Sequence, residues 1–153
     1  MTHYPLLFAR REKVEGNGFI ARVAVSGRVL LTGEEDGEFW VEGVNPGGMA
    51  ANGKSANEAL AQFCQDFLAI LFDIASDAKD FEGFREQVKK FFEDTSAPAL
   101  QEWEEAVQQV RAGEVNAEWL TKRPAETKLG VEVTLLVQPA ATNNDLGEMA
   151  LAA

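Results

Sequence analysis

Residues 36 to 59 read DGEFWVEGVNPGGMAANGKSANEA, and this stretch decides the fold class. Within Glu38–Val44, Phe39 and Val41 share one face of an extended chain while Trp40, Glu42 and Val44 share the other, a pattern with the period of a strand. Pro and Gly in Asn45–Gly48 end that strand. Asn52–Gly53 predicts a second turn.

A capped helix is expected directly after this turn. Ser55 precedes Glu58 by three residues, which is the spacing of a capping box. We expect the helix to run to about Ser76. Its apolar stripe is formed by Ala56, Ala59, Leu60, Phe63, Phe67, Leu71 and Ile74. Leu68, Ile70 and Phe72 widen the stripe, so we expect burial of this helix on two sides.

The residues before the stretch predict an antiparallel hairpin. Glu15–Gly18 is a turn signal, and alternation over Phe19–Leu31 predicts a long strand in which Gly27 marks a bulge or bend. Gly33–Gly37 predicts the hairpin loop that leads into Glu38–Val44. Near the start, Leu6–Phe8 predicts only a short edge strand.

The residues after the first helix predict a helical region and one more strand. A helix is expected from about Asp80 to Glu93. Thr95–Pro98 resembles a cap followed by an early-turn proline, and a third helix is expected after it to about Ala112, with Gly113 at its stop and a stripe formed by Leu100, Trp103, Val107 and Val110. Asn116–Lys122 predicts a helical turn, and Val131–Val137 alternates as a late strand.

These elements predict a single α+β domain over residues 1–138. A small antiparallel sheet of three or four strands packs against the capped hydrophobic helix within 1–78. The helical region covers 80–122 and the late strand covers 130–138. We expect residues 139–153 to form a mobile tail.

Composition narrows the classes of function. The chain has 153 residues, a formal net charge of −11 and 46% hydrophobic residues. A strongly acidic chain without a basic cluster repels phosphate backbones, so we expect no nucleic-acid binding by the domain itself. No secretory signal opens the chain, and the longest apolar run, Phe67–Phe72, is too short to span a bilayer. We expect a cytoplasmic protein without membrane attachment.

The sequence offers no constellation for catalysis or metal binding. His3 is the only histidine and Cys64 the only cysteine. Transition-metal sites and nucleophile–base pairs need more such residues, so we expect no metal, no cofactor and no catalytic residue. Cys64 lies among Phe63, Phe67 and Leu68 and is interpreted as a buried apolar residue.

One motif gives an alternative function, nucleotide binding. Gly48–Ser55 matches the letters of a phosphate-binding loop, G-x-x-x-x-G-K-[ST], with Gly48, Gly53, Lys54 and Ser55 at the fixed positions. A phosphate-binding loop follows a buried parallel strand, whereas the strand here alternates and belongs to a hairpin. Nucleotide binding therefore stays an alternative, beside the interpretation as a glycine turn and a helix cap.

The order of features resembles the HicB-type antitoxin domain. An Asp36–Gly37 turn, an aromatic strand, a Pro–Gly loop and a Gly-x-Ser-x-x-Glu-Ala helix start follow one another between Asp36 and Ala59. This resemblance implies a partly degenerate ribonuclease-H-like fold without catalysis that binds a small toxin protein and oligomerises. The DNA-binding segment common in that family is replaced here by an acidic helical region, so operator binding is not expected.

The resemblance leads to a functional hypothesis. We expect a non-enzymatic interaction protein, antitoxin-like, that occludes a protein partner such as a small basic toxin. The residues assigned to partner binding are Glu34, Glu35, Asp36 and Trp40. A further alternative is a homo-oligomeric structural protein whose broad apolar helix face is a subunit interface.

Overall fold

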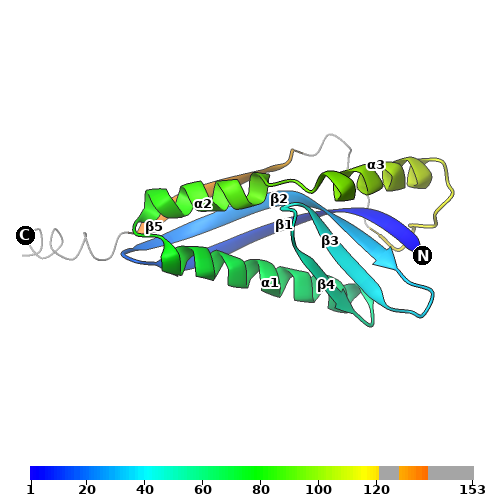
Figure 1. Cartoon of the computed structure of the whole chain (residues 1–153), viewed down its shortest axis with the longest axis horizontal. Coiled ribbons are helices and arrows are strands. Elements are labelled where there is room, and N and C mark those ends of the chain that lie inside the picture. Colours follow the sequence, from blue (N-terminus) through cyan, green and yellow to red (C-terminus); the bar gives the residue numbers. More distant parts are fainter. Residues whose placement is uncertain (121–127, 138–153) are drawn as a thin grey trace, which may run out of the picture.

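The computed structural model describes residues 1–120 and 128–137. It confirms the α+β class, with a curled antiparallel sheet and three helices in this part of the chain (Figure 1). In chain order the elements are β1 (Thr2–Gly16), β2 (Phe19–Gly33), β3 (Phe39–Asn45), β4 (Ala50–Gly53), α1 (Ala56–Asp77), α2 (Phe81–Glu93), α3 (Ala97–Arg111) and β5 (Gly130–Val137). The expected tail, 139–153, lies outside the described residues, as does residue 138.

Strand β2 organises the sheet. β1 pairs with it along its whole length, from Thr2 opposite Gly33 to Gly16 opposite Phe19. On its other edge, β5 pairs with residues 20–26 and β3 with residues 28–33. The expected late strand therefore exists and joins the same sheet, which raises the strand number to five.

Gly27 lies where β2 changes partner on that edge. A bulge was expected near Gly27, and the register shift falls one residue later, between Arg28 and Val29. A side chain at Gly27 would place Cβ 2.2 Å from the backbone oxygen of Asn45. The glycine is needed for this close approach of two backbones.

Strand β1 is much longer than the predicted Leu6–Phe8 segment. It spans 15 residues, including the charged run Arg10–Lys13. These side chains weaken the strand signal in the sequence. They are accommodated because β1 is an edge strand, and Arg10, Arg11 and Lys13 are exposed.

The turn predicted at Asn52–Gly53 is wrong. These residues end β4, in which Phe39 faces Gly53 and Glu42 faces Ala50 across the pair with β3. Gly53 is required by packing rather than by a turn, since an added Cβ would lie 2.7 Å from the backbone nitrogen of Ala59 in α1. A glycine in the sequence does not by itself distinguish a turn from a site where two backbones pack closely.

The N-terminal cap predicted at Ser55 forms, and side chains also cap the other two described helices. Ser55 Oγ accepts from the Glu58 backbone N–H at 3.1 Å, Asp80 caps α2 and Ser96 caps α3. Within the described residues, the return bond of a full capping box, from Ser55 N–H to the Glu58 carboxylate, is not formed. Gly113 has φ of 75°, which suits the stop of α3.

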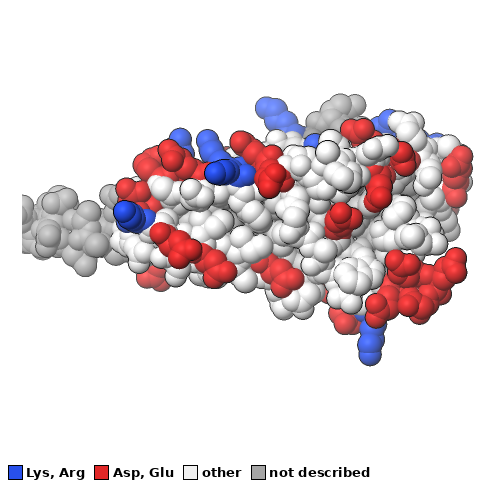
Figure 2. All heavy atoms as spheres, viewed as in Figure 1, with Lys and Arg blue, Asp and Glu red and all other residues white. Residues whose placement is uncertain are grey.

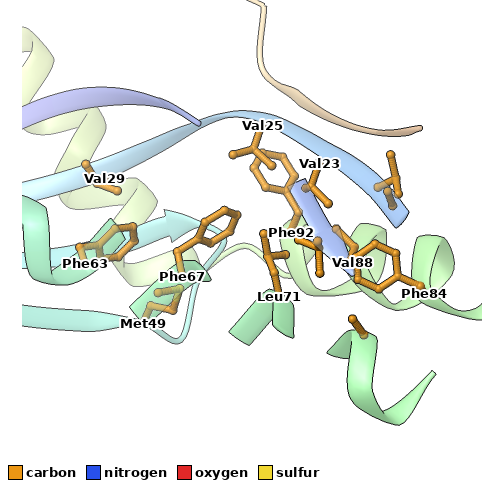
Figure 3. Packing of buried hydrophobic residues seen from close by; sticks show 14 of the residues in the cluster. Val23, Val25, Val29, Met49, Phe63, Phe67, Leu71, Phe84, Val88 and Phe92 are labelled. Carbon is orange, nitrogen blue, oxygen red and sulfur yellow. The ribbon is translucent and has the colours of Figure 1, made fainter. Parts of the chain in front are cut away.

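The core lies between α1, α2 and the face of β2 that carries its odd-numbered residues. On α1 the buried residues recur at every fourth position: Ala59, Phe63, Phe67, Leu71 and Ala75. Phe63 and Phe67 both meet the ring of Phe8 edge-on, at centroid distances of 5.6 and 5.7 Å. Figure 3 shows side chains of β2, α1 and α2 converging in this cluster.

Helix α1 is not buried on two sides as expected. Phe72 on its outer flank is 45% exposed. By length and composition α1 is also the one described helix apolar enough to cross a membrane, a test that core helices of soluble proteins pass as well. In this fold its buried stripe packs against the sheet.

Helix α3 packs on the opposite face of the sheet from α1. The link from α2 passes the end of β3, where Ser96 N–H donates to Val44 O and Gly47 N–H donates to Asp94 O. The fully buried residues of α3 are Ala99 and Ala106, whereas its predicted stripe is only half-buried. Small side chains allow the helix to approach the sheet closely, and the larger ones spread to its flanks.

We predict that Phe67→Ala lowers the free energy of unfolding by about 3–5 kcal/mol, because it leaves a cavity among the aromatic rings. Phe72→Ala is the matched control, with the same change on the same helix at an exposed site. It should cost less than about 1 kcal/mol. Urea denaturation measures both, and equal losses would contradict the core described here.

Candidate functional site

An open hollow lies on the outer face of the sheet, between β3 and helix α3. Its volume is about 530 Å³. We call it the acidic hollow and define it by the side chains that line it: His3, Thr32, Glu34, Trp40, Glu42 and Glu102. Gly48, Ala50 and Ser96 also border it.

The strand register places Trp40 in the floor of the hollow. His3, Thr32 and Trp40 are direct cross-strand neighbours on β1, β2 and β3, so their side chains share one face. The next row of the same face holds Leu30 and Glu42. His3 Nδ1 lies 2.8 Å from Thr32 Oγ1, which fixes one end of the row.

Trp40 is the large apolar residue of this row. Its side chain is 43% exposed, although Val41 beside it is fully buried in the core. Tryptophan is among the residues most enriched where proteins bind one another. An exposed tryptophan in a concave surface therefore marks a candidate contact site.

The side-chain charges around Trp40 are acidic, although the positively charged amino group of Met1 also borders the hollow. Glu34 comes from the β2–β3 loop, Glu42 from β3 and Glu102 from α3. No Lys or Arg is present among the described residues that line the hollow. Acidic side chains also gather at the end of the molecule that carries the β2–β3 loop (Figure 2). The hollow therefore attracts cations and repels other acidic surfaces.

The β2–β3 loop is held in shape by its own residues. The Asp36 carboxylate accepts from the Glu38 backbone N–H at 3.0 Å, and Gly37 has φ of 91°. Glu35 lies 3.8 Å from the amino group of Met1, an exposed pair that contributes little to stability. Glu34, Glu35 and Asp36 also line a smaller depression with Met1.

Helix α3 is fixed to the sheet by Trp103. Its indole N–H donates to the Leu6 carbonyl at 3.1 Å, and the guanidinium of Arg28 lies 5.4 Å from the ring centre. Arg28 Nε also donates to Asn45 Oδ1 at 3.1 Å. These contacts set the position of helix α3, and α3 in turn places Glu102 at the side of the hollow.

The structure brings together some of the predicted site residues. Glu34 and Trp40 line the same hollow, while Glu35 and Asp36 lie on the loop beside it. Sequence reasoning missed Glu42, Glu102 and His3. The strand pattern placed Glu42 on the face of Trp40, so this residue could have been found, whereas Glu102 reaches the site only through the packing of α3.

The phosphate-loop alternative is not favoured by the geometry. Ala50–Gly53, in the middle of the motif, is the extended strand β4. Ser55 Oγ caps α1, and Lys54 is exposed. Of the four motif residues only Gly48 borders the hollow. A phosphate cradle needs successive backbone N–H groups turned toward one point.

Other reactive side chains lie apart from the hollow. No group of three His, Cys, Asp or Glu side chains suited to a metal ion occurs in the described part of the chain. Cys64 is half-buried on α1. Burial raises the pKa of its thiol above the ordinary value, and the nearby Arg10 opposes this rise.

The chain was compared with protein-family models, curated proteins and solved structures, and none of the three comparisons finds a match.

We predict that Trp103→Phe lowers the free energy of unfolding by about 1 kcal/mol, because the Leu6 carbonyl loses its donor. Trp119→Phe is the control, since Trp119 contacts Tyr4 ring to ring and is 53% exposed. It should change stability by less than about 0.5 kcal/mol. Thermal unfolding compares the two, and a harmless Trp103→Phe would show that the indole bond does not hold α3.

Proposed function

We propose that this chain is a non-enzymatic protein-interaction domain that binds a basic segment of a partner protein in the acidic hollow. The observation that carries the proposal is Trp40, exposed in a concave surface beside Glu34, Glu42 and Glu102. A Lys or Arg side chain on the Trp40 ring would meet carboxylates on several sides.

The expected energies assign different roles to these residues. A cation over a tryptophan ring contributes about 0.5–1 kcal/mol when exposed and about 2 kcal/mol when water is excluded. Each exposed ion pair contributes about 0.2–1 kcal/mol. Trp40 therefore supplies most of the affinity of a single contact. The carboxylates mainly raise the association rate and reject acidic partners.

The location of the hollow supports an antitoxin-like interpretation. Trp40, Glu42, Gly48 and Ala50 all border it and all belong to the Asp36–Ala59 segment that resembles the HicB-type domain. A small basic toxin in the cytoplasm is the partner that this resemblance implies. The net charge of −11 supports a basic partner independently.

We predict that Trp40→Ala weakens binding of a short peptide of alternating Lys and Thr about tenfold, because the cation loses the ring face. Fluorescence anisotropy of the labelled peptide measures the affinity. Trp119→Ala is the control, since that exposed tryptophan does not line the hollow. Equal losses in the two variants, or no binding by the unmodified protein, would overturn the proposal.

A charge series tests the same site. The triple variant Glu34→Gln, Glu42→Gln and Glu102→Gln should weaken binding and flatten its dependence on salt, because three attractive charges are removed. Its control carries the same change at three exposed residues of α2: Glu82, Glu86 and Glu93. An equal effect of the control would mean that net charge alone drives the association.

A further inference from the structure

We infer that the partner segment binds as an added strand on the free edge of β4, with its basic side chains over the acidic hollow. This inference rests on the proposed function and names the mode of recognition. It follows from the direction of the backbone groups in β4.

The hydrogen bond between Gly43 and Met49 sets that direction. Gly43 N–H donates to Met49 O at 2.8 Å, in register with the pairs Glu42–Ala50 and Val41–Ala51. In an antiparallel pair, hydrogen-bonded and non-bonded positions alternate. Ala51 is therefore bonded to β3, while Ala50 and Asn52 point their N–H and C=O groups away from it.

These outward groups are accessible. Ala50 and Asn52 are both exposed, whereas Ala51 and Gly53 are buried. Within the described residues, neither Ala50 nor Asn52 forms a hydrogen bond outside the β3–β4 pairing. Four donors and acceptors thus face outward at the spacing that an added strand requires.

A comparison with β1, the other edge strand, supports β4 as the edge to which a strand is added. On β1 the Trp103 side chain lies against the backbone and donates to the Leu6 carbonyl, and the charged pair Arg10–Glu12 lies farther along the strand. Charges and covering side chains are the usual protection of an edge against pairing. β4 contains neither a charged residue nor a proline.

The neighbouring hollow selects the side chains of the added strand. Neighbouring strands lie about 4.8 Å apart, so the added strand lies next to Ala50 and Asn52 and two strands from Trp40 and Glu42. Ala50 is small and leaves the space above it open. A Lys or Arg side chain can pass over it to reach Glu42 and Trp40. Because side chains alternate along a strand, every second residue of the partner segment should be basic.

The experiment compares two peptides and two variants. One peptide alternates Lys and Thr, and the other has the same sequence with its Lys amides N-methylated. This change keeps every charge but removes the backbone donors of an antiparallel added strand that face β4, because residues opposite Ala50 and Asn52 have their side chains on the face of the hollow. Asn52→Pro removes the outward N–H of Asn52 without removing a bond to β3. Asn52→Ala keeps that N–H and is the matched control. Affinity and hydrogen exchange at Ala50 and Asn52 are measured.

We expect N-methylation and Asn52→Pro each to weaken binding about tenfold or more, while Asn52→Ala has little effect. With the unmodified peptide bound, the Ala50 and Asn52 amides should exchange their hydrogens more slowly. If both peptides bind equally and Asn52→Pro behaves like Asn52→Ala, strand addition is overturned while binding in the hollow stands. If neither peptide binds, the proposed function fails and the edge assignment fails with it.

Discussion

Strand β2 is the constraint on which the rest of the structure depends, because it is hydrogen-bonded to three other strands. β1 occupies one edge, and β5 and β3 share the other. Its odd-numbered residues must therefore face the aromatic core, and its even-numbered residues must face outward.

This division of β2 into a core face and an outward face decides where the helices pack. α1 and α2 cover the odd-numbered face, while α3 covers the part of the opposite face around Arg28 and Leu30. Beyond α3 the outward face is open, and there the row that contains Thr32 and Trp40 becomes the floor of the acidic hollow.

Local signals in the sequence were sufficient for most elements. The alternation of Phe19, Ala21, Val23 and Val25 predicted β2, and Ser55, Asp80 and Ser96 stand at the starts of helices because each supplies a side-chain acceptor. What could not be predicted depends on long-range packing. The charged run in β1 is extended because it pairs with residues 22–25 of β2, and Gly53 is a packing glycine because α1 lies against it. Glu102 joins the hollow only because Trp103 fixes α3 on the sheet.

The core and the outer face of the sheet differ in how their large side chains are packed. The core is formed by close contact of large rings, whereas the outer face at β3 leaves Trp40 in contact with water and surrounded by carboxylates. Burying that tryptophan and pairing those carboxylates would recover a favourable free energy that the isolated chain does not have. The open edge of β4 lies beside the same hollow. The open edge of β4 and the carboxylates of the hollow therefore lie at one end of the sheet, the arrangement that the proposed binding of an extended basic segment requires.

The indole region of a ¹H–¹⁵N correlation spectrum is the most direct test of whether a basic segment binds in the acidic hollow. The chain has three tryptophans, and their N–H groups differ in environment. Trp103 donates to Leu6 O beneath α3, Trp119 packs on Tyr4, and Trp40 lies in the hollow. On titration with the Lys–Thr peptide, the Trp40 signal should shift progressively and saturate while the Trp103 signal stays in place. A Trp40 signal that does not move, or equal shifts of all three signals, would contradict binding of a basic segment in the acidic hollow.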